Sequence, residues 1–591
     1  MAMGATVSDR NAGVLRQLAS GWLLPGLGRM ASALAPAPLA KAPVRGIAVP
    51  IRPPARRHLP DAEEIYRGIF TFAGHRVQTA GRIIFDVPES HPEWLRALHG
   101  FSWLKALLRE DVRLWHVQAR TLVQDWARRR RRHPPVARAP MVAAERLTML
   151  VALAPALLKE APAPFEKRLF RLLSAEFRQL HRQLPFMTRP HERLLALLAL
   201  TTASLSLQGL NHALPSLGQR LAEELERQIL PDGAHISRSP ARLLEIVARL
   251  QPLHEAWRQA GVPVSMPDAL DTALQRALPM LRFFRLGDGG LALFQGVSDP
   301  AGGQLAAVLE ADATGARPLC HATHAGFARL AAGRAVLVAD IGRPAPALVN
   351  ADAALSTLAF EFSYGATRII TSCGAPRLPS PEWRRATRFT AAHSAPTLSD
   401  RNAGHLTGGR LARRILGGEN AIGPRRIAAD MADSARGLLL EASHDAWQAR
   451  AGLRCHRRLF LAADGHDLRG EDALIPEGEG SRIPEGEELV IRFHLHPSVK
   501  PTLSRDGCSV LLALPDRTHW RFTARGGTIS IEESVYLPAE EGLCRTCQIV
   551  LRAPVQATGT RISWKLALQP HVSSAARRRK TKVAEAPALP L

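Results

Sequence analysis

The stretch FFRLGDGGLALFQG, residues 283–296, marks the point at which the sequence pattern changes from helical to β. Within it, Gly287, Asp288, Gly289 and Gly290 predict a hairpin-type turn between two β-rich runs. Before this turn, apolar residues recur at helical spacing; after it, short alternating segments are separated by glycines. The pattern therefore predicts a multidomain chain, with an all-α half followed by an all-β half.

The helical half extends from residue 61 to 285. In FEKRLFRLLSAEFRQLHRQL, residues 165–184, apolar side chains recur at three- and four-residue steps, which is typical of an amphipathic helix. The stretch SPARLLEIVARLQPLHEAW begins with Ser239 as a candidate N-cap and Pro240 at the first helical position. Successive helices joined by short turns predict a bundle or a ring of helical hairpins.

The β half extends from residue 286 to 568 and predicts a large antiparallel sandwich, because its segments are short, alternating and punctuated by turns. In LVIRFHLHP, residues 489–497, alternation places His494 and His496 on the same face as Arg492. A shared metal ion and a plain solvent-facing strand both account for that pair of histidines.

Composition predicts a folded globular protein, since 46% of the 591 residues are hydrophobic and 22% are charged. The net charge of +24 favours anionic partners such as nucleic acid, an acidic polysaccharide or a membrane surface. The basic runs at 128–132 and 577–582 have no interleaved aromatic residues for base stacking. We interpret them as a solvated helix end and a tail, and predict no nucleic-acid partner.

The two ends of the chain differ from the rest in composition. Residues 1–60 are rich in proline, alanine and arginine and predict a loosely ordered leader, and residues 569–591 predict a basic disordered tail. The apolar run near the start is short and broken by Pro25, so it makes no convincing signal peptide. We expect no transmembrane segment. The compartment, cytoplasmic or periplasmic and cell-envelope, stays open, as does the oligomeric state.

Several classes of site have no support in this sequence. There is no GxGxxG opening a helix, no Walker loop, no HExxH and no GxSxG, which argues against nucleotide binding, zincin chemistry and serine-hydrolase chemistry. The six cysteines all lie in the second half without regular spacing, which argues against a disulfide scaffold. We therefore expect no cofactor.

Two histidines in the β half are candidate functional residues. His393 lies in RFTAAHSAPTLSD, residues 388–400, just after Arg388, and a neighbouring arginine lowers the pKa of a histidine, so that it is neutral and able to accept a proton. His444 and Asp445 fall in a predicted turn between two β segments. A histidine–aspartate pair on a loop is a common arrangement in catalytic sites.

The order of four segments resembles the heparinase II/III-like C-terminal region: LSTLAFEFSYGATRIITSCG, WRRATRFTAAHSAPTLSD, SHDAW and HRRLFL, starting at residues 355, 383, 443 and 456. That region is the β-sandwich of a superfamily of polysaccharide lyases whose N-terminal half is an α/α toroid. The helical stretch LAEELERQILPDGAHISRSP, residues 221–240, is also similar to the family. The resemblance implies a toroid, an incomplete helical barrel, over 61–285 and a heparinase II/III-like sandwich over 286–568.

What the resemblance implies is a carbon–oxygen lyase that performs β-elimination on an acidic polysaccharide containing uronic acid. A base removes the proton at C5, a positive group neutralises the adjacent carboxylate, and an acid protonates the departing C4 oxygen. We assign His393 as candidate base, Arg388 to the carboxylate and His444 as acid or orienting group. The candidate substrate-binding residues are Arg384, Trp383, His235, Arg238 and Trp447.

This sequence departs from the family pattern at the positions that suggest a metal site. Alignment on Phe360 places Ala354 where relatives carry a histidine, with Ser356 at the following aspartate. Ser372 stands at the aspartate of the next motif, so that only His393 remains. We predict no bound metal.

The usual tyrosine acid or base is also missing. The family tyrosine of the helical half would fall near Arg242 and an acid near Ser237, and Trp447 stands at another tyrosine position. None of the three tyrosines in the chain falls at a family position. The alternative is therefore a non-catalytic glycan-binding relative that keeps the fold and has lost the proton-transfer residues.

Overall fold

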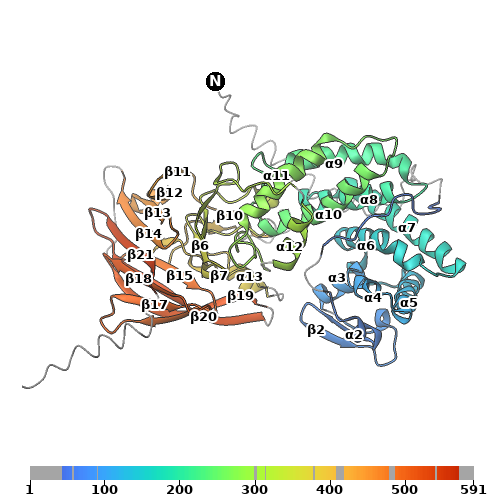
Figure 1. Ribbon diagram of the computed structural model, residues 1–591, viewed down its shortest axis with the longest axis horizontal. Coiled ribbons are helices and arrows are strands. Elements are labelled where there is room, and N and C mark those ends of the chain that lie inside the picture. The colour runs from blue at the N-terminus through green and yellow to red at the C-terminus, as the bar shows by residue number, and fades with distance from the viewer. Residues whose placement is uncertain are drawn as a thin grey trace, which may run out of the picture.

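The computed structural model describes residues 43–55, 59–89, 91–298, 302–312, 314–376, 380–407, 418–477, 486–539 and 542–570. Helices occupy one end of an elongated molecule and two β-sheets occupy the other (Figure 1). The predicted order of a helical half and an antiparallel sandwich is confirmed. The cleft described below lies where the two halves meet.

The predicted leader is partly contradicted. Its residues 1–42, like residues 571–591 of the predicted tail, lie outside the described residues. The described segment 43–55 packs on the helices, with Val44 and Ile51 each 5% exposed. The backbone N–H of Ala48 donates to the carbonyl of Ser206 at 2.7 Å. This segment therefore belongs to the folded helical half.

The helical half is built from antiparallel hairpins. Its elements are α2 (Ala62–Tyr66), β1 (Ile69–Phe72), β2 (His75–Gln78), α3 (Pro92–Gly100), α4 (Leu104–Arg109), α5 (Arg113–Arg129), α6 (Pro140–Leu158), α7 (Ala163–Gln183), α8 (Pro190–Ser206), α9 (Leu214–Gln228), α10 (Pro240–Gln259) and α11 (Asp268–Phe284). Short 3-10 helices lie at Ile84–Asp86, Pro135–Arg138, Leu184–Phe186 and Asn211–Ala213 in this half, and at Ala347–Val349 and Thr390–Ala392 in the β half.

The sequence explains which helices are central. Helices α6 and α8 are buried around nearly their whole circumference, whereas α5, α7 and α9 bury one face and expose charges on the other. Helix α10 begins at Pro240 after Ser239, as predicted, although the Ser239 side chain makes no capping hydrogen bond. By length and apolar character alone α6 could cross a membrane, but 72% of its most apolar 18-residue stretch is buried inside the protein.

The predicted turn at 287–290 is present, but the β-rich run before it is not. Helix α11 continues to Phe284, so Phe283 and Phe284 are the end of a buried helix. The bridge between Arg285 and Leu291 closes the turn, in which Gly289 has a φ of 82°. The β propensity of the residues before the turn predicted a strand. Their packing against the neighbouring helices outweighs that propensity, so that they form the end of a helix.

The sandwich consists of an eight-stranded and a nine-stranded antiparallel sheet, in the orders β11-β12-β13-β14-β21-β18-β17-β16 and β19-β20-β15-β7-β6-β5-β4-β3, with β8 also paired to β15. The strands are β3 (His321–Ala322), β4 (Phe327–Ala332), β5 (Ala335–Asp340), β6 (Phe360–Tyr364), β7 (Thr367–Thr371), β8 (Pro396–Leu398), β11 (Ile427–Ser434), β12 (Gly437–Trp447), β13 (Leu453–Ala462), β14 (Asp467–Pro476), β15 (Glu488–Leu495), β16 (Lys500–Leu503), β17 (Ser509–Ala513), β18 (His519–Arg525), β19 (Thr528–Ala539), β20 (Gly542–Pro554) and β21 (Thr560–Leu568). Beside them lie the pair β9 (His405–Leu406) and β10 (Ala421–Ile422), and the helices α13 (Pro381–Ala386) and α15 (Gln448–Ala451), whereas α12 (Gly302–Glu310) packs against α10 and α11.

A buried ion pair between the sheets positions the segment after His393. Arg457 on β13 binds Asp472 on β14, with 2.5 Å between Nε and Oδ1, and both side chains are almost completely buried. The same guanidinium donates to the carbonyls of Leu358 and Ser394. The backbone next to His393 is therefore fixed by the core of the sandwich.

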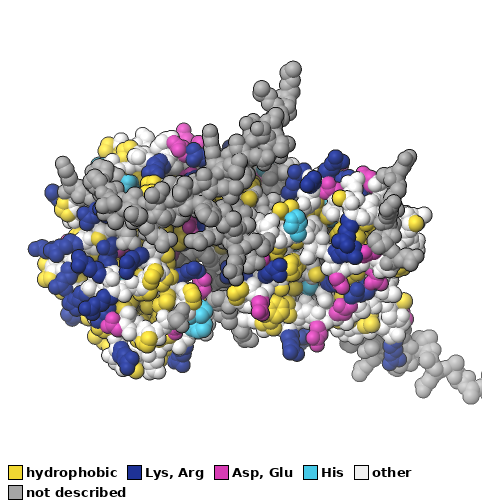
Figure 2. Space-filling model, turned by 180° about the vertical axis from the view of Figure 1, so that it is seen from behind, with side chains coloured by type: hydrophobic (Ala, Val, Ile, Leu, Met, Phe, Trp, Pro, Cys, Tyr) yellow, Lys and Arg dark blue, Asp and Glu magenta, His cyan; other side chains and the backbone are white. Residues whose placement is uncertain are grey.

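Basic side chains gather at the helical end of the molecule, at the left of Figure 2, over α5 and α7. We call this set the basic surface; its exposed members are Arg113, Arg128, Arg131, Arg132, Lys167, Arg168, Arg171 and Arg182. The 128–132 run, which we interpreted as a solvated helix end, thus lies beside the arginines of α7. The contact between Arg168 and Gln124 joins the two helices at 3.3 Å.

Candidate active site

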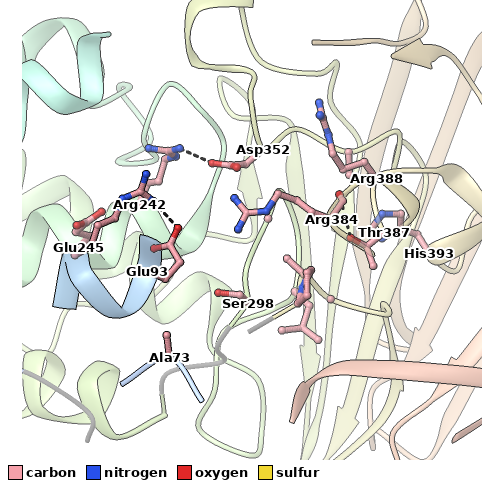
Figure 3. A pocket seen from close by; sticks show the side chains of 17 residues that line it. Ala73, Glu93, Arg242, Glu245, Ser298, Asp352, Arg384, Thr387, Arg388 and His393 are labelled. Atoms are coloured by element: carbon pink, nitrogen blue, oxygen red, sulfur yellow. Dashed lines mark hydrogen bonds and ion pairs between the residues drawn. The ribbon is translucent and has the colours of Figure 1, made fainter. Parts of the chain in front are cut away.

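A cleft of about 600 Å³ lies between the helical half and the sandwich. Helices α3 and α10 line one side, and the other side is formed by α13 and the loops around residues 296, 352 and 375. Its charged and titratable lining residues are Arg96, Arg242, Arg384, Arg388, Glu93, Glu245, Asp352 and His393. The cleft thus combines side chains from both halves of the chain (Figure 3).

His393 lies in the sandwich wall of this cleft, next to Thr387 (Figure 3). It is 2% exposed, and neither ring nitrogen has a hydrogen-bond partner among the described residues. Burial lowers the pKa of His393 to about 4, although the charge of Asp340 and the nearby carbonyl of Thr387 partly oppose that shift. The ring is therefore neutral at physiological pH, as predicted, but burial and not the neighbouring arginine is the cause.

The two arginines near His393 differ in what they bind. The Arg388 guanidinium donates from Nε to the carbonyl of Ala353 at 2.7 Å and from Nη2 to that of Glu419 at 2.8 Å. Arg388 is thus largely committed to holding loops. Arg384 on α13 extends toward the middle of the cleft and has no hydrogen-bond or ion-pair partner for its guanidinium in the described part of the chain (Figure 3).

The helical side of the cleft supplies ion pairs. Arg242, in the first turn of α10, binds Asp352 across the cleft, and Arg96 binds Glu93 within α3. Glu245 accepts from His191 Nε2 at 3.0 Å and lies 3.2 Å from Arg249. Burial works against ionisation of Glu245, but Arg249, His191 and Arg242 more than offset it, so that the pKa of this carboxyl is well below its usual range.

His444 and Trp447 do not lie in the cleft. His444 is on the inner face of the eight-stranded sheet and is completely buried, with its ring centre 5.0 Å from that of Trp447. Burial lowers the pKa of His444 to about 3. The sequence predicted a loop at this position, whereas β12 continues through it to Trp447. The predicted sharing of one cleft by His393 and His444 is therefore wrong.

His235 and Arg238 are buried between the two halves and do not line the cleft. His235 bonds through Nδ1 to Ser237 at 2.7 Å and through Nε2 to Gln228 at 3.1 Å. Arg238 donates to the carbonyls of Ala325, Gly326 and Arg343 and forms an ion pair with Asp340. Their predicted contact with substrate is not supported, since both side chains are buried and their polar atoms are bonded to other parts of the protein.

Trp383 stands on α13 with 37% of its surface exposed, outside the residues that line the cleft. The charged cleft residues that the sequence analysis missed are Asp352, Arg96, Glu93 and Glu245, and Arg242 was placed at a family tyrosine position without a role. No motif marked them, because each reaches the cleft only through the packing of one half on the other.

The residues at the family's metal positions do not fit a metal ion. Ala354 has no ligand atom, and the Ser356 hydroxyl donates to Asp340 Oδ2 at 2.7 Å. Gln295 also donates to Asp340, so that these oxygens are already bound within the protein. Across the described residues, no group of three or more His, Cys, Asp or Glu side chains could hold a metal.

Comparison with known families and sequences gives two matches. The model for "Heparinase II/III-like, C-terminal" matches residues 314–565. FtsZ-localized protein C of Caulobacter vibrioides (strain NA1000 / CB15N) is 35% identical over 354 residues, which cover 58% of this chain and 60% of that protein. The chain thus spans less than two thirds of the length of this curated relative.

Solved structures resemble nearly the whole chain. A mutant of the heparan sulfate lyase HepC from Pedobacter heparinus aligns with a TM-score of 0.60 and 14% identity, covering 97% of this chain and 92% of that one. A crystal structure of heparinase III aligns with a TM-score of 0.64 and 13% identity, covering 87% and 82%. At these identities the likeness establishes the fold of a helical toroid plus β-sandwich.

Proposed function

Because this chain belongs to the heparinase II/III-like family, whose C-terminal domain covers residues 314–565, we propose that its cleft binds a polysaccharide bearing carboxylates. The observation that carries the proposal is the Arg384 guanidinium, which extends into the cleft without an ion-pair partner in the described chain (Figure 3). A guanidinium fork matches the two oxygens of a carboxylate. The net charge of +24 also attracts an acidic polymer.

Elimination on a uronate needs two proton transfers. A base takes the C5 proton, the C5–H electron pair forms the C4=C5 double bond, and the C4–O bond breaks as an acid protonates the leaving oxygen. His393 is a neutral ring beside the cleft, which suits the base. The acid must be a group that holds a proton at neutral pH.

The described lining residues offer no such acid. No tyrosine, lysine or cysteine is among them, and each of the carboxylates Glu93, Glu245 and Asp352 is paired with an arginine. The pKa of Glu245 is held well below its usual range by the surrounding positive charges, so this group has no proton to give at neutral pH. We therefore favour a glycan-binding protein that cleaves its ligand slowly or not at all.

A panel of uronate polymers tests this function. Calorimetric titration reports binding, and the ultraviolet absorbance of an unsaturated C4=C5 end reports cleavage of the same samples. We expect binding to at least one polymer and no burst of absorbance, and binding should weaken about tenfold when Arg384 is replaced by Gln, as for loss of a charge-assisted hydrogen bond. Absence of binding to every polymer would contradict the proposal.

The second candidate is slow elimination with His393 as base and water as acid. The observation that favours it is the lack of a hydrogen bond to either ring nitrogen among the described residues, so that the one unprotonated nitrogen of the neutral ring has its lone pair free to accept a proton. The rate should then fall as the pH drops below about 4, where the ring becomes protonated. His393→Gln should abolish the absorbance signal and leave binding within about threefold. A signal that survives this substitution would exclude His393 as the base.

The similarity to FtsZ-localized protein C supports a separate proposal, which concerns where in the cell this protein is found. We propose that this chain also localises with FtsZ, since 354 residues of it are 35% identical to that protein. A fluorescent fusion of the full chain, imaged with labelled FtsZ in a host that expresses both, tests it. A signal that does not follow FtsZ would refute the proposal without affecting the proposed ligand of the cleft.

A further inference from the structure

One ion pair crosses the cleft from the helical half to the sandwich. Arg242 projects from the first turn of α10, and Asp352 projects from the loop before β6 (Figure 3). Their side chains are 29% and 32% exposed, so that both reach the open space of the cleft. Asp352 is the ion-pair partner that Arg242 has in the described chain.

The position of Asp352 is enforced by its surroundings. Gly296 has a φ of 82°, and a Cβ added there would lie 2.6 Å from the Cβ of Asp352. Arg388 holds the same loop through the Ala353 carbonyl, and Asn350 Oδ1 accepts from the backbone N–H of Ala421 at 2.6 Å. The loop therefore presents the Asp352 carboxylate to Arg242 from a fixed base.

Among the remaining charged side chains of the cleft, one guanidinium has neither a hydrogen-bond nor an ion-pair partner in the described residues. Glu93 is paired with Arg96, and Glu245 is paired with Arg249. Arg384 projects into the same space as the Arg242–Asp352 pair and has no partner among the described residues (Figure 3). Two guanidinium groups from opposite walls thus face the same space as Asp352, whereas the other two carboxylates of the cleft are paired with arginines of the helical half.

We propose that Asp352 is an internal stand-in for the carboxylate of the ligand, and that Arg242 and Arg384 together form the anion-binding site. This inference rests on the proposed glycan binding. A bound uronate takes over Arg242, adds Arg384 as a second partner, and Asp352 turns toward solvent. A neutral sugar cannot make this exchange, because its approach would leave Arg242 without a counter-charge.

The exchange predicts opposite effects for the two kinds of substitution. Asp352→Asn removes the competitor and should tighten binding about fivefold, which corresponds to ~1 kcal/mol. Arg242→Gln and Arg384→Gln should each weaken binding about tenfold. In the Arg242→Gln background, Asp352→Asn should no longer tighten binding, since Asp352 and the ligand carboxylate then have no shared guanidinium to compete for.

The probes are unsulfated tetrasaccharides built on galacturonate, on mannuronate and on glucuronate with glucosamine, with cellotetraose as the neutral probe. Titration calorimetry at fixed salt gives the dissociation constants. Two variants control for charge alone. Asp400→Asn removes the carboxylate of the exposed Arg492–Asp400 pair, and Arg385→Gln removes the neighbour of Arg384 that binds Glu419 outside the cleft. Both controls should change the affinity less than twofold.

Tighter uronate binding by Asp352→Asn, lost in the Arg242→Gln background and absent for cellotetraose, supports the inference. If the wild type binds a uronate and Asp352→Asn does not tighten that binding, the stand-in role is overturned and the proposed function stands. If Asp352→Asn tightens cellotetraose equally, the exchange of charge is overturned. If neither the wild type nor Asp352→Asn binds any uronate, the proposed function is overturned and the inference with it.

Discussion

His393 is buried with two ring nitrogens that lack a hydrogen bond in the described chain, an arrangement that costs about 1–3 kcal/mol for an unsatisfied polar group. The residue borders the cleft, although its ring nitrogens themselves are buried. His494 shows the contrast, since its ring bonds to Ser534 at 2.7 Å and to the carbonyl of Ala391 at 2.9 Å. His191 Nδ1 and His444 Nε2 also lack a partner, but in the described residues His393 is the histidine whose two ring nitrogens are both unsatisfied.

Replacing His393 by Gln should make the protein less sensitive to acid. The folded pKa of about 4 lies below the unfolded value near 6.5, so the unfolded chain binds the extra proton between these values. The free energy of unfolding therefore falls as the pH drops from 6.5 to 4, by up to ~3 kcal/mol from this residue. Urea unfolding gives the free energy of unfolding at pH 7.5 and at pH 4.5. The difference between these two values should be about 2–3 kcal/mol smaller in the variant than in the wild type. His519→Gln on an exposed strand position serves as control, and an unchanged difference for His393→Gln would contradict the prediction.

At the scale of elements, the loop between α9 and α10 is fastened to the strands β4 and β5. Arg238 donates from Nε to the carbonyl of Ala325 at 2.5 Å and from Nη1 to that of Arg343 at 2.7 Å, and its guanidinium lies 4.5 Å above the ring of Phe327. Asp232 accepts from the backbone N–H of Ala325 at 2.7 Å. This fastening sets the position of α10, and hence of Arg242, relative to the sandwich.

Replacing Arg238 by Met should destabilise the protein by about 3–5 kcal/mol, because Asp340 is left buried without its counter-charge. Thermal and urea unfolding measure the change. Arg52→Gln, which removes an exposed pair with Glu255, should cost less than about 1 kcal/mol. Equal losses for both variants would mean that Arg238 does not join the two halves in the way that we describe.

At the scale of the whole molecule, positive charge is concentrated in two different settings. The basic surface over α5 and α7 is open to solvent, whereas the arginines of the cleft are mostly paired or bonded to carbonyls (Figure 2). Interactions of exposed charges are screened within about 8 Å at physiological salt. We therefore expect the basic surface to attract polyanions in general, and the cleft to bind its ligand selectively.

Replacing Arg168, Arg171 and Arg182 together by Gln should separate these two effects. Elution from a polyanion column should move to lower salt, because three exposed charges of the basic surface are lost. The affinity of the cleft for a uronate tetrasaccharide should change less than twofold at physiological salt, since the cleft lies at the other side of the helical half. A parallel loss of cleft affinity would show that the two surfaces bind as one.

Periodicity by itself determined the architecture. The helical spacing of 165–184 and the start at Pro240 both match helices, and the turn at 287–290 lies where the helices end. These features depend on neighbours in the sequence, because the period of apolar residues and the choice of capping residues are local. The motif residues around 388–400 also identified His393, which does border the cleft.

The composition of the site was decided by tertiary structure. His444, His235 and Arg238 are residue types that often occur in catalytic or binding sites. Packing instead buries His444 inside the sandwich, and buries His235 and Arg238 between the two halves. Arg242 and Asp352 lie 110 positions apart and meet only because α10 docks against the sandwich. Which charged side chains share a cleft depends on how two separately patterned halves pack together, and no local pattern in the sequence encodes that contact.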